Sequence, residues 1–156
     1  MIEYKKGNIF DGDENIICHQ TNCLGIMGGG IALQVKNLYP EVYKEYSELC
    51  NEYKEQNNIT SLLGYTQFVE TNDGKYIANC FGQFQVGFGT RQTEYMALQS
   101  CLEQVYKKAS QEGLSVAIPY KIGCGLAGGN WSVVEDMIKK IFDKSSVICV
   151  IYEYVG

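Results

Sequence analysis

The spacing of apolar residues switches along the chain between the period of strands and the period of helices. Met1 to Lys6 alternates apolar and polar positions, which is typical of a strand, and Asn15 to His19 carries the apolar run of a second strand. Four further strands are predicted at Gly64 to Glu70, Lys75 to Phe81, Val116 to Pro119 and Val147 to Tyr154. The Asn-Asp-Gly sequence at 72–74 indicates a hairpin turn between two of them.

Apolar residues that recur every three or four positions predict helices between these strands. The helices are expected at Ile31 to Leu38, Glu41 to about Lys54, Thr93 to Gly113 and Ser132 to about Phe142. Pro40 suits the first turn of the second helix, and Thr93 is expected to cap the third. Ser132 to Glu135 has the form of a capping box for the fourth.

Strands and helices therefore mix along the whole length. Apolar runs such as Val147 to Ile151 indicate strands that are covered on both faces. The predicted fold class is α/β, a three-layer α/β/α sandwich around a mixed, mostly parallel central sheet. A chain of 156 residues fits a single domain spanning 1–156.

The composition fits an ordinary globular domain without export or membrane signals. Hydrophobic residues make up 46% of the chain and charged residues 20%. Met1 to Lys6 alternates and carries charge, unlike a signal peptide, and no apolar run approaches the roughly 20 residues of a membrane helix. We therefore expect a cytoplasmic protein with no membrane partner.

The seven cysteines include no Cys-x-x-Cys pair. Cys18, Cys50, Cys101 and Cys149 lie in apolar segments, so we expect reduced thiols that act as small core residues. Because the chain has a single histidine, a Cys/His zinc site is not expected, and neither a metal nor another cofactor is predicted.

The formal net charge is −5, and long clusters of lysine and arginine are absent from the sequence. This argues against bulk nucleic-acid binding, which depends on neutralising many phosphates with basic side chains. A small anionic ligand remains compatible with the charge, because backbone N–H groups and helix dipoles bind anions without cationic side chains.

Two glycine-bearing loops carry the candidate chemistry. Gln20 to Gly30 and Gly123 to Asn130 each lie between a predicted strand and a predicted helix, where the carboxyl end of a strand opens a crevice. Glycine lets the main chain approach a ligand closely. Neither loop has P-loop or G-x-G-x-x-G spacing, so the spacing alone indicates only a phosphorylated small molecule.

Several segments resemble the macrodomain family in order and spacing along nearly the whole chain. They are Gly7-Asn8-Ile9, Cys18-His19-Gln20-Thr21-Asn22, Met27-Gly28-Gly29-Gly30-Ile31-Ala32-Leu33 and Pro119-Tyr120-Lys121-Ile122-Gly123-Cys124-Gly125-Leu126, with Trp131 after the last. The chain looks most similar to the branch of ADP-ribose-1''-phosphate phosphatases and ADP-ribose glycohydrolases. The resemblance implies binding of ADP-ribose or a derivative, free or attached to a macromolecule.

The resemblance also implies roles for individual positions. Asn8 and Ile9 match an adenine-contacting pair in which the family usually has Asp at the first position, and the Asn8 carbonyl is expected to accept from the adenine amino group. Asn22 matches a position near the distal ribose, the ribose remote from adenine. Further matches are Gly28, Gly29, Gly30 and Ile31 in one phosphate loop, Gly123, Cys124, Gly125 and Leu126 in the other, and Gln83 and Phe84 beside the adenine and distal ribose.

His19 is the candidate catalytic residue. It lies at the end of a predicted strand, and the resemblance implies a part in cleaving a terminal phosphate, as nucleophile or general acid–base near the distal ribose. Related de-ADP-ribosylating enzymes use a lysine and an aspartate, but Gln83 lies near the lysine position and Ala127 follows Leu126 here. Neither residue can replace the lysine or aspartate chemistry.

Three interpretations remain open at the level of sequence. The first is a hydrolase of ADP-ribose derivatives, for which phosphatase action is the best-matched chemistry and glycohydrolase action an alternative. The second is a non-catalytic ADP-ribose reader, which needs only the two loops. The third is a generic nucleotide-phosphate binder. Without the resemblance, Asn8 is equally well a turn residue and Asn22 a loop cap.

Overall fold

The computed structural model describes residues 1–87 and 89–155, so position 88 of the predicted loop 82–90 lies outside the described residues. The strands are β1 (Ile2–Lys6), β2 (Ile16–Thr21), β3 (Thr66–Glu70), β4 (Tyr76–Phe81), β5 (Val116–Pro119) and β6 (Cys149–Glu153). They form one sheet in the order β1-β6-β5-β2-β4-β3. All pairs are parallel except β3 with β4, which is the predicted hairpin.

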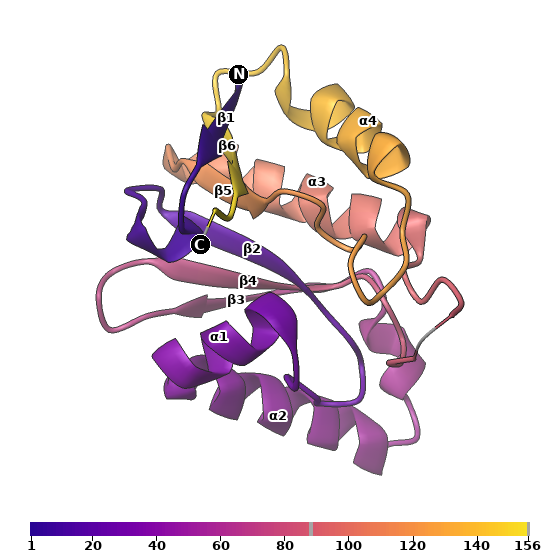
Figure 1. Ribbon diagram of the computed structural model, residues 1–156. Helices are drawn as coiled ribbons and strands as arrows, with labels where there is room; N and C mark the ends of the chain where they lie inside the picture. Colours follow the sequence, from indigo (N-terminus) through magenta and orange to yellow (C-terminus); the bar gives the residue numbers. More distant parts are fainter. Residues whose placement is uncertain (88, 156) are drawn as a thin grey trace.

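The helices cover both faces of this sheet (Figure 1). They are α1 (Gly30–Leu38), α2 (Pro40–Glu55), α3 (Tyr95–Glu112) and α4 (Trp131–Phe142), with short 3-10 turns η1 (Ile9–Asp11) and η2 (Ile59–Leu62). In Figure 1, α1 and α2 lie on one side of the sheet and α3 and α4 on the other. The predicted three-layer α/β/α sandwich is therefore confirmed.

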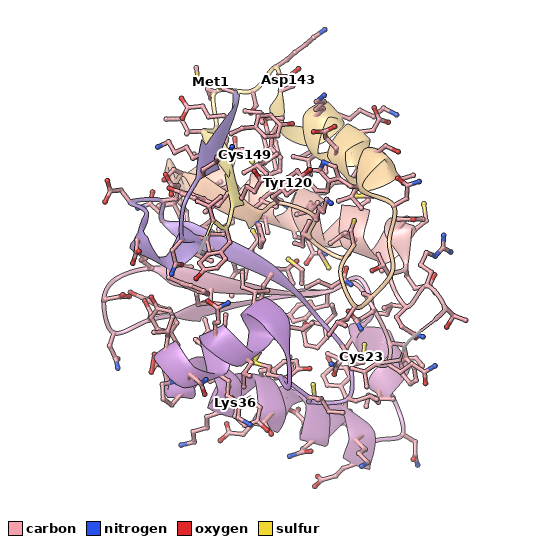
Figure 2. The ribbon with its side chains drawn as sticks, viewed as in Figure 1. Met1, Cys23, Lys36, Tyr120, Asp143 and Cys149 are labelled. Atoms are coloured by element: carbon pink, nitrogen blue, oxygen red, sulfur yellow. The ribbon has the colours of Figure 1, made fainter. Side chains whose placement is uncertain are left out.

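The inner strands contribute to two core layers because successive side chains point to opposite faces. On β2, Ile16 and Cys18 pack with the residues of α3 and α4, whereas Ile17 packs with those of α1 and α2. Figure 2 marks Cys149 and Cys23, which belong to these two separate layers. Continuous apolar runs in the sequence correspond to strands buried on both faces.

Two predicted helix caps are wrong by one or two residues. The N-cap of α3 is Glu94 and not Thr93, whose hydroxyl donates instead to the carbonyl oxygen of Gly123 at 2.6 Å. The N-cap of α4 is Asn130, whose side chain accepts from the N–H of Ser132 at 2.9 Å, so Ser132 already lies inside the helix. The first difference arises because the Thr93 side chain bonds across the fold, and the second because the Asn130 side chain caps the helix locally.

The seven cysteines are free thiols, and six of them are buried, including the four expected in the core. Within the described part of the chain, no helix has the length and apolarity required to span a membrane. The same residues include no group of three or more His, Cys, Asp or Glu side chains arranged to hold a metal ion.

We predict a large loss of stability when Leu102 on the inner face of α3 is truncated. Leu102 is fully buried, so Leu102→Ala is expected to lower the free energy of unfolding by about 2–5 kcal/mol. Met96 on the same helix is 80% exposed, and Met96→Ala is expected to change it by no more than about 0.5 kcal/mol. Urea denaturation of both variants checks this; equal losses would contradict the assigned core.

Candidate functional site

The candidate site is a cleft at the carboxyl ends of two adjacent parallel strands. β2 and β5 pair in the middle of the sheet, and the chain leaves β2 toward α1 and β5 toward α4. Connections that diverge from neighbouring strands in this way open a crevice at the sheet edge. In Figure 2, Tyr120 marks the chain just after β5.

The cleft consists of two lobes that share a wall. Lobe A and lobe B each enclose about 360 Å³. Lobe A is lined at one end by 7–10, Tyr152 and Tyr154, and lobe B by 20–22, Ile26, Val86 and Gly87. Both are lined by Gln20, Gly29, Ala32, Gln83, Leu126 and Ala127. Their volumes lie within the range of small-molecule sites.

The first glycine loop leads into the amino end of α1. Gly29 is the N-cap in an extended conformation, with φ −156° and no side-chain cap. Among residues 1–87 and 89–155, no acceptor pairs with the N–H groups of Gly30, Ile31 and Ala32, which line lobe A. Unpaired amides at a helix amino end form a binding site for an anion, reinforced by the helix dipole.

The second glycine loop lies on the opposite side of the cleft. Gly123 has φ +72°, a left-handed conformation that favours glycine. The loop is closed by a bond from the N–H of Gly129 to the carbonyl of Gly123 at 2.9 Å. The N–H groups of Gly125, Leu126 and Ala127 donate to no group in the described ranges, so a second set of free donors lines the cleft.

Gln20, at the end of β2, connects the surrounding loops. Its Nε2 donates to Oε1 of Gln83 at 2.8 Å and to Oγ1 of Thr93 at 2.9 Å. Thr93 in turn bonds to the carbonyl of Gly123. A Cβ on Gly123 would lie 2.9 Å from Oε1 of Gln20, and one on Gly82 would collide with the same atom. The absence of a side chain at Gly82 and Gly123 therefore leaves the space that the Gln20 side chain occupies.

The lining of lobe B is mainly apolar, and its polar side chains are neutral. It includes Gln20, Thr21, Asn22 and Gln83, and no ionisable side chain among the residues that the structure describes. The Oγ1 atom of Thr21 and Oε1 of Gln20 are buried and have no hydrogen-bond partner within that part of the chain. Buried polar atoms without a partner are costly, and these two oxygens are enclosed by the surrounding side chains and backbone.

Asn22 uses its side chain to shape the first loop. Its Oδ1 accepts from the N–H groups of Leu24 at 3.0 Å and Ile26 at 3.2 Å, and from the hydroxyl of Tyr46 at 2.9 Å. Its Nδ2 donates to the carbonyl of Ile26 at 2.8 Å. Asn22 lines lobe B, as its predicted role near a ligand requires, and these bonds make it a positioning residue.

The lining of lobe A is richer in aromatic rings and contains one cation. Phe10, Tyr120, Tyr152 and Tyr154 line it together with Lys121, and no Asp or Glu does among the described residues. The hydroxyl of Tyr152 donates to Oε1 of buried Glu14 at 2.7 Å, outside the lobe. Burial and this carboxylate raise the pKa of Tyr152 to about 12. The lobe thus suits a planar, uncharged group.

His19, the predicted catalytic residue, lines neither lobe of the cleft, and its catalytic role stays a prediction. It is fully buried. Its Nε2 lies 2.6 Å from Oδ1 of Asn79, whose Nδ2 donates to Gln67, so Nε2 of His19 carries the proton. Burial lowers the pKa of His19 to about 4 and keeps the ring neutral near pH 7.

The cleft brings together most of the other predicted site residues. Lining residues from that set are Asn8, Ile9, Asn22, Gly28, Gly29, Gly30, Ile31, Gln83, Gly123, Gly125 and Leu126. Phe84 and Cys124 line neither lobe. The Phe84 carbonyl accepts from the N–H of Cys23, and burial raises the pKa of the Cys124 thiol, which therefore stays protonated near neutral pH.

Sequence reasoning missed Gln20 and Thr21 and the wall formed by Tyr152 and Tyr154. A signal for the first two exists, because β2 runs to Thr21 and strand side chains alternate between faces. Ile17 packs on the α1/α2 face, so His19, two residues further along the strand, is predicted to point into the same buried layer. Gln20 and Thr21 are the last residues of the strand and lie where it reaches the cleft. Tyr152 reaches the site through the pairing of β6 with β5, and Tyr154 follows directly after β6.

The fold is an α/β/α sandwich, and two sets of free amides line a cleft at the carboxyl ends of its parallel strands. This combination is typical of a domain that binds a phosphorylated ligand. Comparison with known families makes this specific. The family model of the Macro domain matches residues 18–138, so the chain belongs to the macrodomain family.

Named relatives span several activities. An ADP-ribose 1''-phosphate phosphatase from Meyerozyma guilliermondii is 29% identical over 89% of this chain and 93% of its own length. A DNA ADP-ribosyl glycohydrolase from Mycobacterium bovis is 31% identical over 100% of this chain, which spans only 43% of that relative. The solved macrodomain of Mycobacterium tuberculosis DarG has a TM-score of 0.82 at 29% identity, with 97% of each chain covered.

We predict that His19 affects stability in a pH-dependent manner. Its pKa is lower in the folded state than the ordinary 6.5, so its contribution is complete above pH 6.5 and is lost as the pH falls toward 4. His19→Gln removes this titration. Between pH 7.5 and 5, the wild type should lose about 2 kcal/mol more unfolding free energy than the variant. Urea denaturation measures this, and identical pH profiles would contradict a buried neutral His19.

Proposed function

We propose that this macrodomain binds ADP-ribose or one of its derivatives along the cleft. The observation that carries the proposal is the pair of free amide sets, at 30–32 and 125–127, on opposite walls. A diphosphate is a short anion with oxygens on two sides, so it can accept from both sets at once. The two lobes extend in different directions from the residues that line both of them.

The linings of the lobes support one orientation of the ligand. The planar adenine fits the aromatic wall of lobe A beside Phe10 and Tyr154, and Lys121 adds a positive charge near the adenosine end. The distal ribose then lies in lobe B, which the side chains of Gln20, Thr21 and Asn22 line. A chain with net charge −5 can bind this anion because no carboxylate lines either lobe among the described residues.

The proposed activity is hydrolysis of a group on the distal ribose. The names of the phosphatase and glycohydrolase relatives support it. The neutral lining of lobe B restricts the chemistry, since within the described residues no side chain there acts as a base or a nucleophile of lowered pKa. Electrostatic help to an attacking water would come from the amides of the second loop.

A reader of ADP-ribose attached to a macromolecule is the second candidate. The same neutral lining favours it, because binding needs the amides alone. The exposed side chains of Ile26, Val86 and Leu126 flank lobe B and would contact the attached partner.

Because the chain has free thiols in its core, we propose the cytoplasm as its location.

Gly123→Ala is expected to weaken ADP-ribose binding by about ten-fold or more, or about 1.4 kcal/mol. The added Cβ disfavours the left-handed backbone and presses on Gln20, which displaces the amides that follow. Gly74 has φ +84° in the remote β3–β4 turn, so Gly74→Ala shares the strain but should leave affinity unchanged. Calorimetry with ADP-ribose, AMP and NAD measures both; equal affinity for all three ligands in the wild type would contradict the proposal.

Turnover of ADP-ribose-1''-phosphate is expected to be independent of pH between about pH 7 and 9. The substrate's terminal phosphate has its second pKa near 6 and is fully ionised in this range. His19, with its pKa lowered to about 4, is neutral throughout. Phosphate release followed across this range checks the prediction, and a bell-shaped profile centred within it would reveal a titrating side chain that lobe B lacks.

A further inference from the structure

Thr93 is a fully buried residue that precedes α3 and lines neither lobe of the cleft. Its backbone is attached to the chain that leaves β4. It forms an antiparallel bridge with Gln83, and the N–H of the next residue, Glu94, donates to the carbonyl of Gly82 at 2.8 Å. Thr93 is therefore anchored to the sheet independently of the second glycine loop.

The segment at 92–93 bonds to both ends of the second glycine loop. The hydroxyl of Thr93 donates to the carbonyl of Gly123 at 2.6 Å. The carbonyl of Ala127 accepts from the N–H of Thr93 at 3.2 Å and from the N–H of Gln92 at 2.7 Å. Two carbonyls four residues apart in the loop are thus bonded to one short segment.

The loop also packs closely against this segment at both ends. A Cβ on Gly123 would lie 3.1 Å from Oγ1 of Thr93, and one on Gly128 would lie 3.3 Å from Cα of Arg91. The absence of a side chain at both glycines allows this close approach of the loop backbone. Packing and hydrogen bonding therefore fix the same two points of the loop.

These two points enclose the free N–H groups of the loop. Each peptide group is planar, so its C=O and the N–H of the next residue turn together. The bonded carbonyls of Gly123 and Ala127 fix the peptide groups that end in the N–H groups of residues 124 and 128. The three peptide groups between them carry the N–H groups of 125–127, which have no acceptor in the described part of the chain.

We propose that Thr93 is a positioning residue, whose hydroxyl keeps the amides of 125–127 in the direction that binds a diphosphate. The effect on ligand binding rests on the proposed function, whereas the effect on the loop does not. The hydroxyl uses both of its hydrogen-bonding functions, because it also accepts from Nε2 of Gln20 at 2.9 Å. Valine has nearly the same shape without either function, and serine retains both.

The test compares Thr93→Val with Thr93→Ser and with a matched control, Thr66→Val. Thr66 is also buried, its hydroxyl donates to the carbonyl of Cys101 at 3.0 Å, and it lines neither lobe. Both valine variants thus lose a buried hydroxyl-to-carbonyl bond, and urea denaturation is expected to show a similar loss of stability in each.

In calorimetry, Thr93→Val is expected to weaken ADP-ribose binding by about ten-fold or more, because the amides of the loop lose their common direction. Thr93→Ser and Thr66→Val should retain the wild-type affinity. In ¹⁵N NMR spectra of the protein without ligand, the amides of 125–127 should shift in Thr93→Val and stay near their wild-type positions in Thr93→Ser.

Wild-type affinity in Thr93→Val would overturn the assignment. An equal loss of affinity in Thr66→Val or in Thr93→Ser would also overturn it, because lost stability would then explain the effect. If the wild type does not bind ADP-ribose, the proposed function fails, and the NMR spectra decide the inference about the loop. Unchanged amides of 125–127 in Thr93→Val would overturn that inference.

Hydrogen exchange in the wild type provides a test that does not depend on whether Thr93→Val folds. The N–H groups of Gln92 and Thr93 are expected to exchange slowly, because both are bonded to the Ala127 carbonyl, and those of 125–127 rapidly. Rapid exchange at both Gln92 and Thr93 would show that the segment does not hold the loop and would overturn the proposal.

Discussion

The Gln20 side chain is the contact on which the shape of the cleft depends. It joins the end of β2 to Gln83 after β4 and to Thr93 before α3, and Thr93 extends the chain of bonds to the loop after β5. Segments far apart in the sequence are thereby held around one buried amide. These bonds tie the loop after β5 to the end of β2, which helps to fix the direction of the amides that line the cleft.

In this arrangement, the proposed binding of an anion depends on backbone N–H groups and not on ionisable side chains. The donors proposed to hold the diphosphate are backbone N–H groups at 30–32 and 125–127, which need no charge and do not titrate. The histidine supports the fold instead, because it is buried, neutral and bonded to Asn79 within the sheet. An acidic chain can therefore bind a diphosphate, and any catalysis in lobe B has to rely on position and electrostatics.

The sequence was sufficient to predict the architecture and the walls of the cleft. Periodicity located every strand and helix, and glycine between strand and helix located both loops, because these signals are local. The alternation of β2 is also a local signal, and it predicts that His19 turns into the α1/α2 layer. Other side-chain directions depend on distant segments. Thr93 turned to the Gly123 carbonyl across the fold, and Tyr152 entered the site through strand pairing that no local pattern encodes.

The central claim is that the two amide sets hold one diphosphate between them. A titration of the ¹⁵N-labelled protein with ADP-ribose, followed by NMR, tests it directly at each N–H group. The account predicts that the amides of Gly30, Ile31 and Ala32 and those of Gly125, Leu126 and Ala127 shift together along one binding curve. Shifts confined to one loop, or absent from both while the ligand binds, would contradict it.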